Sequence, residues 1–284
     1  MFPAHYSWRP FEMKRIIVAV ALVAFAATAF AQTLKDGLYF AQEEAFSSSG
    51  WKDQIVLEVK GGKIAAADWN GVSNIAGAAD KKAYDKAGKY NMKKFGKSQG
   101  EWWEEAAKVE AYLVSSQDLA FSKIKADGKT DAISGASITV KGFFDLAKKA
   151  VAAGPVAKGS YQKDGWFYAQ QAAFDAKSTW KDTVLVTVVN GRVVSAVWNG
   201  ISSDAKKKSK ITESVTGKYG MVKFGKAQSE WDVQTAKAEA ALVKAQDPAS
   251  IAVKADGKTD AVTGVSIAVS PFLALAAEAL KAAR

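Results

Sequence analysis

The stretch WKDQIVLEVKGGKIAAADW, residues 51–69, alternates apolar and polar side chains on both sides of Gly61-Gly62. A second stretch, WKDTVLVTVVNGRVVSAVW at residues 180–198, does the same around Asn190-Gly191. Alternation with a period of two is typical of a strand with one buried face, and both dipeptides accept the positive φ angles of a two-residue turn. We therefore predict that each stretch forms a β-hairpin.

These hairpins belong to a longer internal repeat with an offset of 129 residues. The offset superimposes aromatic and acidic positions, namely Trp51 on Trp180, Trp69 on Trp198, Tyr90 on Tyr219, Phe95 on Phe224, Trp102 on Trp231 and Asp131 on Asp260. Upstream, KDGLYFAQ from Lys35 matches KDGWFYAQ from Lys163 at an offset of 128. Between the copies, AAGPVAKGS from Ala152 contains the glycine and proline of a linker. A period this long indicates two complete domains, at residues 33–154 and 159–284.

The rest of each copy predicts helices beside the hairpin. A segment that begins near Gln99, or near Gln228 in the second copy, places its apolar residues on one helical face. In the first copy these residues are Trp102, Ala106, Val109 and Leu113. We expect a short strand next, then a loop that occurs twice, and then an apolar helix in which Pro271 fits the first turn. This order predicts an α+β fold, a small antiparallel sheet packed with helices, duplicated as two tandem domains.

Residues 1–31 have the composition of a leader and signal peptide. From Met13, MKRIIVAVALVAFAATAFAQ combines a basic start, an apolar run and small residues at Ala29 and Ala31. We expect cleavage after Ala31, and an uncleaved membrane anchor is the alternative. The sequence therefore predicts an exported protein, periplasmic or extracellular after signal peptide cleavage.

The chain from Gln32 onward contains neither cysteine nor histidine, because the only histidine is His5. This excludes zinc and copper centres built on these side chains, cysteine or Ser-His nucleophiles and imidazole proton shuttles. No acid–base pair stands out, so we assign no catalytic residue and no metal site. Redox activity would need a bound cofactor.

The predicted mature chain is moderately basic, with 36 basic and 28 acidic residues and a formal net charge of +8. Its lysines are spread over both copies, with one tight run at Lys206–Lys208. A solvated surface accounts for this surplus, and attraction to phosphates or lipid surfaces is the alternative. Export argues against nucleic acid as a partner.

The loop that occurs twice is KADGKTDAISGASI from Lys125 and KADGKTDAVTGVSI from Lys254, identical at 11 of 14 positions. Its last serine falls where the following helix is expected to begin. One interpretation is an N-cap, in which the serine oxygen accepts a hydrogen bond from an amide of the first helical turn. The other is an anion site, in which free amides beside a glycine approach a phosphate, with Lys129 or Lys258 nearby. The spacing alone leaves both interpretations open.

The pattern Asp-x-x-[Ser/Thr]-Gly-Ala-[Ser/Thr] in this loop resembles the flavinylation motif of the FMN-binding domain family. That family includes the C subunit of the sodium-translocating NADH:quinone oxidoreductase, the G subunit of the Rnf complex and flavoproteins of extracellular electron transfer. The stretches that begin at Asp36, Gly50 and Lys89 also resemble the small FMN-binding branch. The chain departs from the motif in two ways: both acceptors are serine where the family usually has threonine, and Val265 replaces the motif alanine.

The resemblance implies a cofactor, partners and site residues. In the family, a periplasmic flavin transferase takes FMN from FAD and joins its phosphate to the last hydroxyl residue of the motif, which corresponds to Ser137 and Ser266. The surrounding motif positions are Asp131, Ser134, Gly135 and Ala136 in the first copy and Asp260, Thr263 and Gly264 in the second. We therefore expect an exported electron carrier with FMN in a Ser phosphoester, whose partners are redox proteins or a quinone-linked membrane complex.

Two alternatives stand beside covalent flavin. The first is noncovalent FMN binding, and the second is a non-redox duplicated surface or binding module in which the loop only caps a helix. Several aromatic and sulfur side chains that flank the turns are candidates either for stacking on a flavin or for the core. These are Trp69, Tyr90 and Met92, with Trp198, Tyr219 and Met221.

Overall fold

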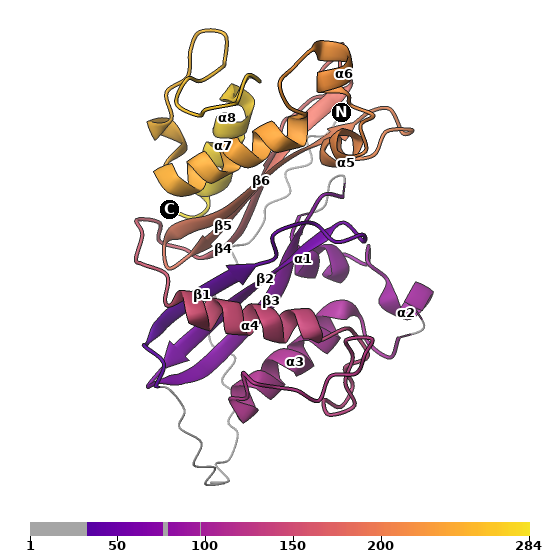
Figure 1. Ribbon diagram of the computed structural model, residues 1–284, viewed down its shortest axis with the longest axis vertical. Coiled ribbons are helices and arrows are strands. Elements are labelled where there is room, and N and C mark those ends of the chain that lie inside the picture. The colour runs from indigo at the N-terminus through magenta and orange to yellow at the C-terminus, as the bar shows by residue number, and fades with distance from the viewer. Residues whose placement is uncertain (1–32, 76–78, 97) are drawn as a thin grey trace. The chain divides into compact units, whose positions relative to one another are not determined.

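The computed structural model describes residues 33–75, 79–96 and 98–284 (Figure 1). The expected leader, residues 1–31, lies outside the described residues. Each copy of the repeat contains a three-stranded antiparallel sheet and several helices (Figure 1). The predicted α+β fold, duplicated in tandem, is therefore confirmed. Within the described ranges, no helix has the length and apolar character needed to cross a membrane.

Both sheets are meanders, in which the three strands of each copy lie side by side in chain order. The strands are β1 (Gly37–Gln42), β2 (Trp51–Lys60) and β3 (Lys63–Ser73) in the first copy, and β4 (Gly165–Gln170), β5 (Trp180–Val189) and β6 (Arg192–Ser202) in the second. In the hairpins, Lys60 pairs with Lys63 and Val189 pairs with Arg192. Both predicted hairpins are therefore present, with the predicted two-residue turns.

The turns of the hairpins adopt the left-handed conformation. The φ angles are 58° and 75° at Gly61 and Gly62, and 53° and 69° at Asn190 and Gly191. The carboxylate of Asp36 accepts hydrogen bonds from the amides of Gly61 and Gly62 at 3.0 and 2.9 Å. Asp164 accepts one from the amide of Gly191 at 2.8 Å. The aspartate of each Asp-Gly opening thus ties the first strand to the neighbouring hairpin turn.

The helices follow the hairpins in chain order. In the first copy they are α1 (Lys81–Lys86), α2 (Met92–Gly96), α3 (Trp102–Ser116) and α4 (Lys141–Ala153). In the second copy they are α5 (Lys210–Val215), α6 (Met221–Gly225), α7 (Trp231–Ala245), the short 3-10 turn η1 (Pro248–Ser250) and α8 (Ser270–Lys281). The helix expected near Gln99 begins at Trp102, where the amide of Glu101 donates to the Glu104 carboxylate at 2.8 Å.

A tryptophan on the third strand of each sheet forms the centre of the core. The ring of Trp69 lies 5.2 Å from that of Trp102 on α3 and 5.1 Å from that of Phe143 on α4. The second copy repeats this cluster with Trp198, Trp231 and Phe272, at 5.4 and 5.1 Å from the first of them. Because one ring contacts both long helices, these helices cover the same face of the sheet, and burial of the rings supplies much of the hydrophobic stabilisation.

The short strand expected before the loop is absent from the described residues, so that prediction was wrong. Residues 121–125 belong to no strand, and the amide of Ile124 donates to the carbonyl of Ser122 at 2.8 Å. Instead the hydroxyl of Thr130 donates to the carbonyl of Lys123 at 2.6 Å, and the ring of Phe121 stacks on Phe144 of α4 at 4.4 Å. Phe121, in the segment expected to form the strand, is therefore part of the core beneath α4, and the segment is held by the side chain of Thr130.

Candidate functional site

Ser137 and Ser266 lie four residues before α4 and α8 begin, and they are not N-caps. The amides of Val140 and Lys141 donate to the carbonyl of Gly128, at 2.8 and 3.2 Å. The second copy has the two equivalent bonds, at 2.7 and 3.0 Å. A carbonyl of the same loop thus satisfies the amides that a serine cap would bind. The N-cap interpretation of these serines was wrong for this reason.

The glycine of the motif is required by its backbone conformation. Gly135 has a φ angle of 73° and Gly264 one of 76°, in the region that side-chain-bearing residues adopt at a cost. A Cβ at either position would lie 2.4 Å from the ammonium nitrogen of a lysine on the preceding long helix, Lys108 or Lys237. In the first copy the Lys108 ammonium donates to the Gly135 carbonyl at 3.1 Å. In both copies, therefore, a lysine side chain from the preceding long helix packs against the glycine turn.

Directly after this turn, two successive amides point at one acceptor. In the first copy the amides of Ser137 and Ile138 donate to Oε2 of Glu105, on α3, at 2.6 and 3.1 Å. The Ser137 hydroxyl donates to the same carboxylate at 2.9 and 3.0 Å, and the Ser98 hydroxyl contacts it as well. We call this arrangement of two amides and one serine hydroxyl the amide cradle. The cradle has the geometry of a site for an oxyanion, and a carboxylate of the chain itself lies in it.

The second copy builds the same cradle around a neutral side chain. Oε1 of Gln234, on α7, accepts from the amides of Ser266 and Ile267 at 2.7 and 3.2 Å and from the Ser266 hydroxyl at 3.1 Å. The amide nitrogen of Gln234 donates to the carbonyl of Ser229 at 2.9 Å. Ala227 stands where the first copy has Ser98. The two cradles thus share their backbone and differ in the charge that fills them.

Glu105 is ionised in its cradle. Its side chain is fully buried. Burial raises the pKa of this carboxyl, but the hydrogen bonds from Ser98, Ser137 and Ile138 outweigh it, so the pKa lies below its ordinary value. Gln234 is equally buried and carries no charge at any pH. The cradle of the first copy is therefore the negatively charged one.

The other motif residues divide between surface and core. Asp131 and Asp260 form exposed ion pairs with lysines of the same loop, Lys125 and Lys254, at 2.6 and 2.9 Å. Ser134 and Thr263 are exposed, whereas Ala136 and Val265 are buried. The bulk of Val265 thus lies inside the protein, and Ser137 and Ser266 present their side chains on the outer surface of the loop.

Sequence reasoning missed Glu105, Gln234 and the two lysines beside the glycine turn, and it pointed to Lys129 and Lys258 instead. Glu105 and Lys108 lie three residues apart on one face of α3. The signal available in the sequence was this i, i+3 pair in the predicted helix, which returns as Gln234 and Lys237 with only the charge at the first position changed.

The aromatic candidates for flavin contact are mostly core. Trp69 and Trp198 are each 2% exposed and fill the centre of the two cores. The other candidates, Tyr90, Met92, Tyr219 and Met221, are half-buried. Among the described residues, the most exposed rings are instead Phe95, at 73%, and Phe224, at 69%, on the short helices α2 and α6. These two phenylalanines superimpose in the repeat, and sequence reasoning did not single them out for ligand contact.

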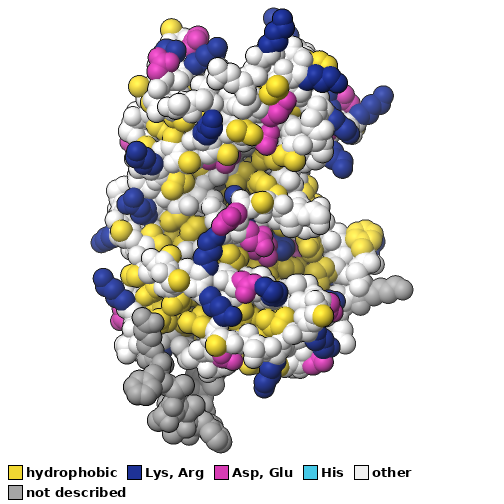
Figure 2. All heavy atoms as spheres, in the orientation of Figure 1, with side chains coloured by type: hydrophobic (Ala, Val, Ile, Leu, Met, Phe, Trp, Pro, Cys, Tyr) yellow, Lys and Arg dark blue, Asp and Glu magenta, His cyan; other side chains and the backbone are white. Residues whose placement is uncertain are grey.

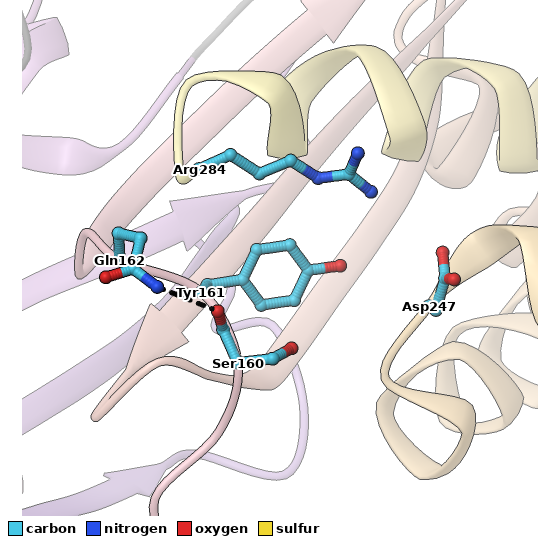
Figure 3. Close-up of a pocket in the computed structure, with 5 residues that line it drawn as sticks. All are labelled: Ser160, Tyr161, Gln162, Asp247 and Arg284. Atoms are coloured by element: carbon cyan, nitrogen blue, oxygen red, sulfur yellow. Dashed lines mark hydrogen bonds between the residues drawn. The ribbon is translucent and has the colours of Figure 1, made fainter.

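Two surface hollows lie outside the cradles. One, of about 440 Å³, is lined by residues 122–125 and 130–132, at the base of the first loop, and includes Asp131. The other, of about 350 Å³, lies in the second copy and is lined by Ser160, Tyr161, Gln162, Asp247 and Arg284. Figure 3 shows the Tyr161 ring between Ser160 and Arg284, with Asp247 on the far side. The Tyr161 hydroxyl donates to the carbonyl of Gln246 at 2.9 Å, so this polar group is already bound.

Charges are dispersed over the face of the molecule that Figure 2 draws. Figure 2 shows lysine and arginine side chains scattered across the visible face with acidic side chains between them, and not one basic patch. In the part of the chain that the structure describes, no cluster of three aspartate, glutamate, histidine or cysteine side chains is placed to hold a metal ion.

Comparison with known proteins names no family for the chain. No family model matches, and no curated protein matches. Among solved structures, the chain is similar to a structural-genomics target from Clostridium thermocellum solved by NMR, at 51% identity over 42% of this chain and 92% of that one, with a TM-score of 0.35. It is also similar to a protein from Clostridium perfringens solved by crystallography, at 28% identity over 43% and 88%, with a TM-score of 0.33. The names of both proteins state no ligand or activity.

Proposed function

We propose that this chain is an exported flavoprotein that carries FMN on Ser137, on Ser266 or on both, and that it acts as an electron carrier. The observation that carries the proposal is the amide cradle, in which an exposed serine hydroxyl and two successive amides converge on one acceptor in each copy. Convergent amides suit a phosphoryl oxygen, because they donate without a side chain that must be desolvated or ordered.

The residues around the cradle fit a phosphoester. Gly135 and Gly264 leave the outer side of the turn without a side chain, and Lys108 and Lys237 place a positive charge beside it. An anionic phosphoryl group on the serine oxygen would be favoured by both features. The flavin, when bound, supplies one- and two-electron transfer, for which the chain offers no cysteine or metal cluster of its own in its described part.

Attachment requires a flavin dinucleotide and a transferase. The serine oxygen forms a bond to the flavin-side phosphorus of FAD, and the bond from that phosphorus to the bridging oxygen breaks. AMP leaves with the bridging oxygen, and the hydroxyl proton passes to a base of the transferase or to water. No oxidation state changes, so no oxidant or reductant is needed. The expected partners are a periplasmic flavin transferase and, for electron transfer, redox proteins or a quinone-linked membrane complex.

Production of the full chain together with a flavin transferase tests the proposal. The intact mass should rise by one or two FMN groups, and the yellow colour should persist through acid precipitation. Ser137→Ala and Ser266→Ala should each remove the label from their own loop only, and the double variant should remove it from both. An unmodified mass in the parent chain contradicts covalent attachment.

A non-redox binding module is the second candidate, and one observation favours it. Each serine hydroxyl already donates to Glu105 or Gln234, which fastens the loop to α3 or α7. The cradle would then serve the fold alone. If the mass is unmodified, noncovalent FMN binding and a non-redox module remain. Equilibrium dialysis against free FMN separates them, because noncovalent binding gives a saturable signal and a non-redox module gives none.

A further inference from the structure

We infer that the two serines are unequal acceptors, and that Ser266 takes the phosphoryl group in preference to Ser137. This inference rests on the proposed function and adds to it the residues that decide between the sites. The side chain that fills the cradle is the ionised carboxylate of Glu105 in the first copy and the neutral carboxamide of Gln234 in the second.

In the first copy, a phosphoryl oxygen must displace an anion to reach the amides. Glu105 accepts hydrogen bonds from both amides and from the Ser137 hydroxyl of the cradle, and a further one comes from Ser98. A phosphodiester on the Ser137 oxygen would place a second negative charge beside a carboxylate that lies 2.9 Å from that same oxygen. Two like charges at this separation repel, and burial of Glu105 weakens screening by water. The charged cradle therefore opposes both the approach and the product.

In the second copy neither obstacle exists. Gln234 has no charge to repel a phosphoryl group, and its carboxamide has both an acceptor and two donors. Rotation of that group by half a turn would present its NH₂ group to an anion on Ser266, with loss of its hydrogen bond to the carbonyl of Ser229. An ionised glutamate has acceptors only and cannot do this. The cradle of the second copy can therefore exchange its internal partner for a phosphoryl group without burying two negative charges together.

The other surroundings of the two serines do not differ in this way. Lys108 and Lys237 lie against the glycine turn at the same distance in both copies. Val265 and Ala136 are each 8% exposed, so the larger side chain of the second copy lies in the core and leaves the outer face open. The difference between the sites thus reduces to positions 105 and 234, with the hydroxyl of Ser98 as an additional partner of the carboxylate.

Exchange of these two residues tests the inference. The full chain is incubated with FAD and a flavin transferase, and flavin on the two loop peptides, which contain Ser137 and Ser266, is quantified over time by mass spectrometry. In the parent chain we expect Ser266 to be labelled faster by about tenfold, the ratio that corresponds to about 1.4 kcal/mol. Glu105→Gln should raise the rate at Ser137 towards that at Ser266, and Gln234→Glu should lower the rate at Ser266.

The double exchange, Glu105→Gln with Gln234→Glu, is the most decisive variant because it keeps the net charge of the chain and should reverse the preference for Ser266 over Ser137. Thermal unfolding of each variant, followed by circular dichroism, controls for loss of fold. The ratio of the two labels is measured within one molecule and does not depend on protein concentration. Equal labelling that none of the exchanges alters overturns this inference and leaves covalent flavin standing. Absence of label from every variant and from the parent overturns both.

Discussion

The carboxylate of Glu239 accepts a hydrogen bond from the backbone amide of Trp198 at 2.7 Å. In the first copy Glu110 makes the same bond to Trp69, also at 2.7 Å, and in addition pairs with Lys82 at 2.8 Å. The second copy has Ile211 where the first has Lys82. Duplication has therefore left one glutamate in its structural position without the lysine that accompanies its counterpart.

We predict that Glu239→Gln stabilises the protein at alkaline pH. Burial raises the pKa of Glu239 to about 7 from its ordinary value of 4.5, and the hydrogen bond from Trp198 and the positive charge of Lys52 offset this only in part. Because the folded pKa is the higher one, the stability linked to this group is fully present below pH 4.5 and is lost as the pH rises through about 7. Glutamine keeps the carbonyl acceptor and cannot ionise.

Urea unfolding of the parent and the variant across this range measures the effect. The two should coincide near the acid end and separate as Glu239 ionises, with the variant more stable. Glu110→Gln is the matched control, and we expect a smaller gain or none there because glutamine forfeits the ion pair with Lys82. A difference between parent and Glu239→Gln that does not vary with pH would contradict the assigned ionisation.

Glu105→Gln is expected to destabilise the protein at neutral pH, in contrast to the stabilisation expected of Glu239→Gln at alkaline pH. The pKa of Glu105 lies below its ordinary value of 4.5, because hydrogen bonds outweigh burial. The contribution of its ionised form to stability is therefore present above pH 4.5 and is lost as the pH falls through the lower, folded pKa. The variant should be less stable than the parent at neutral pH and should lose less stability on acidification. The free energy of unfolding is measured with urea at each pH. An equal loss in the two proteins as the pH falls would argue against an ionised Glu105.

Gly135→Ala should destabilise the protein by about 1–2 kcal/mol, because alanine must adopt a left-handed φ angle. The contact with the Lys108 ammonium adds little, since that flexible end can move away. Addition of Lys108→Ala should therefore not restore stability, as measured by chemical unfolding. Gly96→Ala is the control: its φ angle is not positive and no atom lies within 4 Å of the added Cβ, so stability should be unchanged or slightly raised.

Phe143→Ala should cost about 3–5 kcal/mol, the range for removal of a fully buried aromatic ring. This ring contacts both Trp69 and Phe144, so its loss leaves a cavity between α4 and the sheet. Phe95→Ala, which removes a ring that is 73% exposed, should change stability by less than about 0.5 kcal/mol. Comparable losses from the two substitutions in thermal or urea unfolding would show that Phe95 is not a surface residue in solution.

The hairpins and the long helices were predictable because each depends on local chemistry. Strands and helices show periods of two and of 3.6 residues in the apolar side chains, and the turns are marked by Gly-Gly and Asn-Gly. These patterns depend only on residues that are close in the sequence. The strand before the loop was mispredicted because Phe121 obtains its burial from Phe144 on α4, a contact between segments that only the fold brings together.

The candidate site was predictable only in its backbone. The motif identified the serines, and the left-handed turn at Gly135 follows from the glycine itself. That Glu105 fills the cradle was not predictable, because it lies 32 residues from Ser137 and its contact depends on how α3 packs. The same holds for Val265, whose burial is decided by the core and not by the loop.

The carbonyl of Gly128 holds the first amides of α4 without help from Ser137. Helix formation and the presence of an alcohol in this loop are consequently independent requirements. Removal of the hydroxyl should therefore leave the start of α4 in place, although it removes the bond to Glu105. If the Ser137→Ala variant takes up no flavin at this loop, the cause would thus be the missing acceptor oxygen and not the loss of α4.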